Sequence, residues 1–144
     1  MKSYHKFLDH TADALFMAEA DTLSELFEQC ALAVQEVMIN PLKVQAQQKV
    51  EITGENKNIE NLLFDFLDDL IYHKDAEQLV FSHFEVKIEE KEGEVFQLKC
   101  IAFGEKINPE KHEPKVDIKA ITMHMFEVKR TETGTWQAQV LVDV

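Results

Sequence analysis

The sequence has few glycines, prolines and cysteines, and it lacks the motifs that identify several common enzyme classes. Its 144 residues include only 4 glycines, 3 prolines and 2 cysteines. No GxGxxG, P-loop or GxSxG pattern occurs, and so few glycines leave little material for a loop that cradles phosphate. HExxH and paired Cys/His spacings are absent too, which argues against soft-metal chemistry. The chain therefore lacks the usual equipment for nucleotide chemistry of its own.

The cysteines and the apolar segments indicate a cellular compartment. Cys30 and Cys100 are far apart and belong to no CxxC motif, so we expect two reduced thiols in or near the core. No apolar run approaches the ~20 residues that a membrane-spanning helix needs. The first residues, Met1–Tyr4, lack the charged and apolar pattern of a signal peptide. We therefore expect a cytoplasmic protein.

Positive charge is scarce as well. The chain has 15 Lys and Arg residues against 27 Asp and Glu residues, which gives a net charge of −12. This charge opposes strong direct binding of nucleic acid, because affinity for phosphate depends on clustered cations. It fits a protein with a basic partner, a protein that holds cations, or simply an acidic, soluble surface. With 45% hydrophobic residues, the chain is long enough for one folded domain over residues 1–144.

Hydrophobic periodicity predicts an α+β fold, with two main helices on one face of a mixed or antiparallel sheet of about six strands. Thr22 and Glu25 form a capping box that predicts the start of the first helix, which Asn40-Pro41 ends. A second apolar stripe at helical spacing runs from Ile59 to Ile71. We expect two extended segments within residues 4–18, one on each side of residues 9–13. Further strands are expected at 43–54, 79–89, 94–103, 116–129 and 135–144. We expect 104–115 to be a polar loop and 116–129, apolar on both faces, to be a central strand.

A short polar knot, residues 9–13, stands between two apolar runs near the start of the chain. Burying ionised carboxylates without partners costs several kcal/mol, so the knot lies in water or has a partner elsewhere. In the last strand, the two-residue period puts Asp143 on the polar face. One explanation for this acidic residue is that Asp143 simply lies at a frayed strand end. The other is a hard-cation site, because Mg²⁺ and Ca²⁺ prefer several oxygen ligands, with Asp9 and Asp13 as further donors.

Lys119 and two histidines are further candidates. Lys119 lies near the start of the predicted strand 116–129, on the face of Asp117, where it needs a partner or a path to solvent. An ordinary Lys–Asp pair at the strand end is the simpler interpretation. His10 and His112 are candidates for metal ligands or polar contacts, although a lone histidine in a charged loop such as that of His112 is usually solvated.

Several short motifs, taken in order, resemble the archease family across essentially the whole chain. They are Phe7–Asp13, Leu23–Phe27, Gly104-Glu105, Lys111–Glu113, Ile118–Thr122 and Val142–Val144. The resemblance implies a small α+β protein that is not itself an enzyme. It implies a protein cofactor of the GTP-dependent RNA ligase of tRNA splicing or RNA repair, which promotes guanylylation of the ligase and its multiple turnover.

The resemblance also implies a site. The family binds a divalent cation through aspartates, which by position are Asp13 and Asp143, and Val144 adds main-chain or terminal oxygen. The ion would be Ca²⁺, or Mg²⁺ or Mn²⁺. Lys119 matches a further functional position of the family. The residues expected to shape the turn that holds the first aspartate in place are Asp9, His10 and Thr11.

A ligase cofactor would have the ligase protein as its partner and would not bind a membrane. Two other functions also remain possible. The first is a metal-dependent phosphoester hydrolase that uses the same carboxylates. The second is a chaperone-like interaction module. A hydrolase would turn over a phosphoester by itself, whereas a module of the second kind would tolerate Asp13→Ala and Asp143→Ala.

Overall fold

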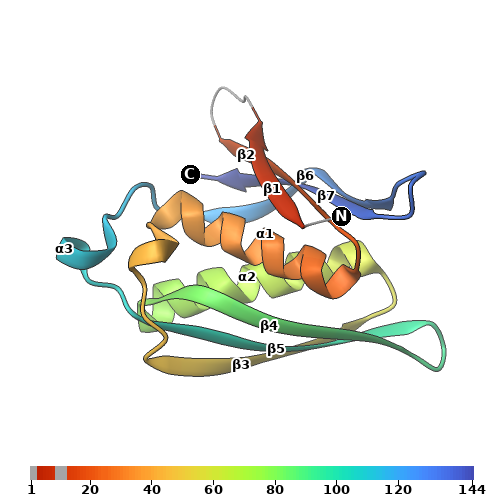
Figure 1. Ribbon diagram of the computed structural model, residues 1–144, viewed down its shortest axis with the longest axis horizontal. Helices are drawn as coiled ribbons and strands as arrows, with labels where there is room; N and C mark the ends of the chain where they lie inside the picture. Colours follow the sequence, from red (N-terminus) through yellow and green to blue (C-terminus); the bar gives the residue numbers. More distant parts are fainter. Residues whose placement is uncertain (1–2, 9–12) are drawn as a thin grey trace.

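The structure, a computed structural model, describes residues 3–8 and 13–144. Two long helices lie between two antiparallel sheets (Figure 1). The elements are β1 (Tyr4–Leu8), β2 (Ala14–Ala20), α1 (Leu23–Met38), the 3-10 turn η1 (Pro41–Lys43), β3 (Gln48–Asn56), α2 (Ile59–Glu77), β4 (Leu79–Lys91), β5 (Val95–Lys106), α3 (Pro109–His112), β6 (Ala120–Arg130) and β7 (Trp136–Asp143). Within the described residues, no helix is long and apolar enough to cross a membrane.

The predicted α+β class is confirmed, but the strands form two sheets where we expected one. In the described part of the chain, seven strands make a four-stranded sheet in the order β1-β2-β7-β6 and a three-stranded sheet in the order β3-β5-β4. Each helix contacts both sheets, α1 through β2 and β4 and α2 through β3 and β6. The apolar faces of both helices are therefore buried between the two sheets.

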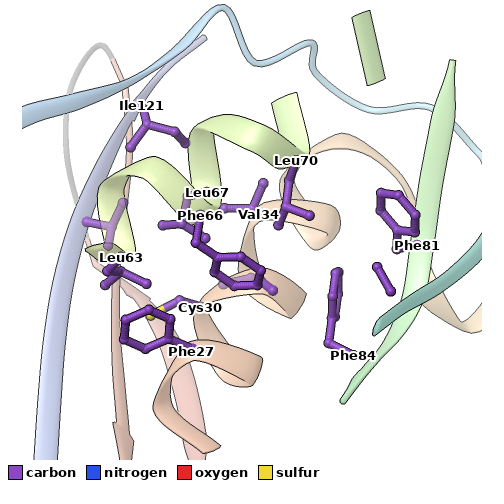
Figure 2. Packing of buried hydrophobic residues seen from close by; sticks show 14 of the residues in the cluster. Phe27, Cys30, Val34, Leu63, Phe66, Leu67, Leu70, Phe81, Phe84 and Ile121 are labelled. Carbon is purple, nitrogen blue, oxygen red and sulfur yellow. The ribbon is translucent and has the colours of Figure 1, made fainter. Parts of the chain in front are cut away.

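The core lies around the two helices. Phe27 of α1 and Phe66 of α2 stack with their ring centroids 5.8 Å apart. Figure 2 shows this pair with Ile121 of one sheet on one side and Phe84 of the other sheet on another, so one core joins both sheets. The cysteines are free and buried, as predicted. Burial raises the pKa of the Cys30 thiol, and it raises that of Cys100 to about 12, so both stay protonated at neutral pH.

The predicted limits of the first helix are confirmed. The Thr22 hydroxyl accepts a hydrogen bond from the Glu25 N–H at 3.1 Å and caps the helix. The helix ends at Met38, and Pro41 then begins the turn η1. This turn delays the next strand, which begins at Gln48 and not at residue 43.

Helix side chains close one edge of each sheet. Three side chains of α1 accept hydrogen bonds from N–H groups along the outer edge of β4, and one side chain of α2 does so for β6. The bonds run from Phe81 to Gln35 (2.9 Å), from Val86 to Glu28 (2.9 Å), from Ile88 to Ser24 (3.1 Å) and from Val128 to Glu60 (2.9 Å). Open strand edges are ready to pair with other chains, and these contacts occupy part of both edges.

The prediction of a central strand at 116–129 is wrong. β6 begins at Ala120 and forms an edge of the four-stranded sheet. Its pairing with β7 is interrupted between Thr122 and Glu127, and within this bulge Met125 has a φ of 58°. The bulge leaves Met123 and Met125 exposed, while Phe126 turns inward and packs against Phe64. Apolar residues therefore occur on both faces without a second neighbouring strand.

Candidate functional site

Three segments that are distant in the sequence meet at one end of the four-stranded sheet. Ala14, the first residue of β2, pairs with Val142 of β7, so Asp13 and Asp143 are the next residues along these neighbouring strands. The first residue of β6 pairs with Asp143. Just before it, the N–H of Lys119 donates to the main-chain oxygen of Asp143 at 2.8 Å. The fold thus gathers two acidic residues and one basic residue beside the chain end marked C in Figure 1.

The two aspartates lie directly beyond the last pair of the β2–β7 ladder, Ala14 and Val142. Opposite residues of an antiparallel pair point to the same face. The neighbouring Val142 belongs to the core on the helix side, so this register directs Asp13 and Asp143 to the outer face. Both residues are half-buried, whereas Lys119 is exposed. Because neither residue is fully buried, both positions can be reached by a hydrated cation from solvent.

The donor chemistry at this end fits a hard cation. Asp13 and Asp143 would contribute carboxylates, and the half-buried Val144 would add main-chain or terminal oxygen. Such all-oxygen sites suit Ca²⁺ or Mg²⁺ better than zinc. In residues 3–8 and 13–144, no group of three or more His, Cys, Asp or Glu side chains is gathered to hold a metal ion. The predictions for Asp9, His10 and Thr11 fall outside the described residues and stay predictions.

Asp117, the residue expected to pair with Lys119, pairs with Lys74 instead. Lys74 lies in the last turn of α2, and its ammonium donates to the carboxylate of Asp117 and, at 2.8 Å, to the carbonyl of Ile118. The sequence indicates this contact only weakly. Lys74 is a basic residue near a helix C-terminus, where the helix dipole stabilises positive charge. Lys74 supports the segment that leads into Lys119.

The charged loop around His112 indicated a solvated side chain, but His112 is fully buried. Its Nδ1 accepts from the N–H of Asn108 at 2.8 Å, so the proton of the neutral ring is on Nε2, which donates to Glu105 at 3.1 Å. Both ring nitrogens thus have partners, one at the start of α3 and one at the end of β5. These contacts explain a structural role for His112, and its functional role stays a prediction.

Glu105 connects this loop to the rest of the molecule. Its carboxylate, 12% exposed, accepts from the Gln45 N–H at 2.6 Å, from Lys111 at 2.8 Å and from His112. Burial acts to raise the pKa of Glu105, but these hydrogen bonds outweigh it and lower the pKa to about 2. The charged form of this carboxyl is therefore favoured by folding.

We expect this carboxyl to make the protein acid-sensitive. Because the pKa of Glu105 is lower in the folded protein, the unfolded chain binds the proton first as the pH falls. Its stabilisation is complete above about pH 5 and is lost as the pH falls towards 2. Glu105→Gln should cost about 1–3 kcal/mol at pH 7 and flatten the acid limb, measured by urea unfolding across pH.

Glu89 is the matched control for this prediction. Its pKa is also about 2, because exposed Lys91 and Lys87 bind it, but the carboxyl lies in solvent. Glu89→Gln should have little effect in 0.5 M salt. Equal losses for the two variants in high salt would contradict the role assigned to the Glu105 network.

Comparison with known proteins identifies the family. A family model described as the Archease protein family (MTH1598/TM1083) matches residues 5–144. The chain belongs to the archease family. The protein archease of Pyrococcus furiosus is 44% identical over 136 residues, which cover 94% of this chain and 95% of that protein. The protein archease of Pyrococcus abyssi is 42% identical over 144 residues, with both chains covered completely.

Solved structures share the fold of this archease-family chain. The solution structure of protein 1598 of Methanobacterium thermoautotrophicum has a TM-score of 0.86 at 39% identity, over 97% of this chain and 98% of that one. The crystal structure of an archease from Thermotoga maritima, described as a possible chaperone, has a TM-score of 0.62 at 19% identity, over 96% of both chains. The family predicted from the short motifs is thus confirmed, and the second structure supports the fold alone.

Proposed function

We propose that this archease-family protein is a non-catalytic cofactor of a GTP-dependent RNA ligase in tRNA splicing or RNA repair. It promotes guanylylation of the ligase and supports repeated turnover. The main support is the meeting of Asp13, Asp143 and Lys119 at one end of the four-stranded sheet. The ligase supplies the nucleotide site and the nucleophile, and this chain supplies charged groups.

The chemistry of guanylyl transfer explains why such groups help. The reaction releases pyrophosphate from GTP, and cations neutralise the negative charge that develops on the phosphates. Asp13 and Asp143 are the residues that would hold a divalent ion, Ca²⁺ or Mg²⁺ or Mn²⁺, which supplies this neutralisation when bound. The exposed ammonium of Lys119 would orient a phosphate oxygen beside them. The two aspartates would hold the ion and the lysine would orient the phosphate, and none of the three residues would act as a nucleophile.

The net charge supports a basic partner. A protein of charge −12 is steered towards a surface that binds RNA, because such a surface is positive. Free, buried Cys30 and Cys100 fit a reducing compartment. We therefore propose that the protein meets its ligase in the cytoplasm.

A reconstituted reaction tests this function. The protein is mixed with its cognate ligase, labelled GTP and a divalent metal, and the labelled ligase–GMP and the ligated RNA are measured. We expect faster formation of ligase–GMP and more than one turnover per ligase, even when the cofactor is substoichiometric. Ligase alone and this protein alone are the controls. No acceleration over ligase alone would refute the function.

A chaperone-like role is the second candidate, because the Thermotoga maritima relative is described as a possible chaperone. It predicts more soluble, active ligase, with no dependence on Asp13 or Asp143. The reconstituted reaction separates the two, since a chaperone would not speed guanylylation of ligase that is already folded. Incubation of the isolated protein with phosphoesters and Mg²⁺ or Mn²⁺ tests the hydrolase alternative in parallel.

A further inference from the structure

The peptide group between Ile118 and Lys119 is held from both sides. Its carbonyl, on Ile118, accepts from the ammonium of Lys74 at 2.8 Å. Its N–H, on Lys119, donates to the main-chain oxygen of Asp143 at 2.8 Å. Because a trans peptide is planar and its C=O and N–H point in opposite directions, the two bonds fix the orientation of the plane. That orientation fixes the position of the N–Cα bond of Lys119, and so of the main chain from which its side chain leaves.

Lys74 is well suited to hold this peptide. Its side chain is only 9% exposed, and its ammonium binds Asp117 and, at 2.8 Å, Asp75 in addition to the carbonyl. Burial acts to lower the pKa of Lys74, but the two carboxylates outweigh it and raise the pKa above its usual value. The ammonium is therefore charged at neutral pH and directed by three partners. Hydrogen bonds from charged donors are stronger than neutral ones.

The segment before Lys119 has no regular secondary structure of its own. Its first part is tied to α1, where the N–H of Lys115 donates to the Met38 oxygen at 2.8 Å. Its last part depends on Lys74, which reaches across from the end of α2, 44 residues earlier in the sequence. Through Lys74, α2 thus contacts the segment that leads to the end of the sheet where Asp143 lies.

We propose that Lys74 is a positioning residue for the candidate site, because it orients the Ile118–Lys119 peptide and so holds Lys119 beside Asp143. Lys74 touches neither a metal nor a nucleotide in this role. The consequence for ligase activation rests on the proposed function, whereas the orientation of the peptide does not depend on the ligase.

Two substitutions test this role. Lys74→Met keeps the apolar stem and removes the ammonium, and Lys74→Arg restores a charged donor. In Lys74→Met we expect hydrogen exchange of the Lys119 amide, followed by NMR, to be about tenfold faster. We expect the maximal rate of ligase–GMP formation to fall about tenfold while the concentration for half-maximal activation stays unchanged. Lys74→Arg should recover most of both losses.

Lys91→Met is the matched control, because the Lys91 ammonium binds exposed Glu89 on the other sheet. It should change neither readout. All variants are assayed well below their unfolding temperatures, and the Cys100 amide in β5 serves as the internal reference for exchange. A general loosening would speed both amides, and that result would overturn the proposal.

The outcomes also separate this proposal from the proposed function. Unchanged exchange of the Lys119 amide in Lys74→Met would show that Lys74 does not hold the peptide. Faster exchange with full activation would show that the orientation has no part in activation. If the unmodified protein fails to activate the ligase, the proposed function is wrong, and exchange alone then decides whether Lys74 holds the peptide.

Discussion

Asp143→Asn is expected to abolish divalent-cation binding and activation of the ligase while leaving the fold intact. The substitution keeps the shape of the side chain, and the main-chain oxygen that pairs with Lys119 is unchanged. It replaces one of the two carboxylates at this end of the sheet by a neutral amide, whose oxygen binds a divalent cation more weakly because it carries no charge. Loss of a residue that merely supports a ligand costs 10–100-fold in affinity, so loss of a ligand should cost more than about 100-fold.

Calorimetric titration with Ca²⁺ and the ligase–GMP assay measure this effect. Asp68→Asn on the exposed face of α2 is the matched control and should match the unmodified protein in both assays. Asp13→Asn should behave like Asp143→Asn, because the two residues lie directly beyond the last ladder pair, Ala14 and Val142. Ca²⁺ affinity that survives in Asp143→Asn would show that this carboxylate is not a ligand.

Gly104→Ala should cost far more stability than the same change at Gly54, the other glycine in the described strands. Gly104 lies in β5 opposite Phe81, where β4 has a bulge. A Cβ atom at Gly104 would lie 1.9 Å from the carbonyl oxygen of Val80 and 2.8 Å from the Cα of Phe81. These are backbone atoms, so relief requires β4 to separate from β5. We expect a loss of more than about 3 kcal/mol in the free energy of unfolding, measured in urea.

Gly54→Ala, in the same sheet, is the control for Gly104→Ala. Its Cβ would approach the Leu62 Cδ1 at 3.2 Å and the Leu98 Cδ2 at 3.8 Å, and the ends of leucine side chains can shift. This variant should stay within about 1 kcal/mol of the unmodified protein. Similar losses in the two variants would mean that the close approach of β4 is not the reason for glycine at 104.

The features that depend on local sequence were predictable. The capping box at Thr22 and the apolar stripe after Ile59 set the starts of both helices, and the two-residue period of 135–144 identified the core face of β7. The number of sheets was not predictable, since it depends on which strands pair across the helices. The edge position of β6 was missed because a bulge around Met125 imitates the pattern of a buried strand.

The candidate site was predictable in part for the same reason. Strand periodicity and the family resemblance indicated Asp13 and Asp143, and the register places these positions next to each other. The support from Lys74 was not predictable, because its partner is 44 residues away and no periodic pattern connects them. The burial of His112 was missed because its partner Glu105 comes from the end of β5, which extends beyond the predicted strand.

The helix side chains that close the edges of β4 and β6 act only after the helices have docked. A folding intermediate in which the sheets have formed but α1 and α2 are still loose leaves both edges open to other chains. Docking of the helices therefore competes kinetically with collisions between molecules. We therefore expect the yield of native protein on refolding to fall as the chain concentration rises, until Ser24, Glu28, Gln35 and Glu60 occupy the N–H groups of these edges.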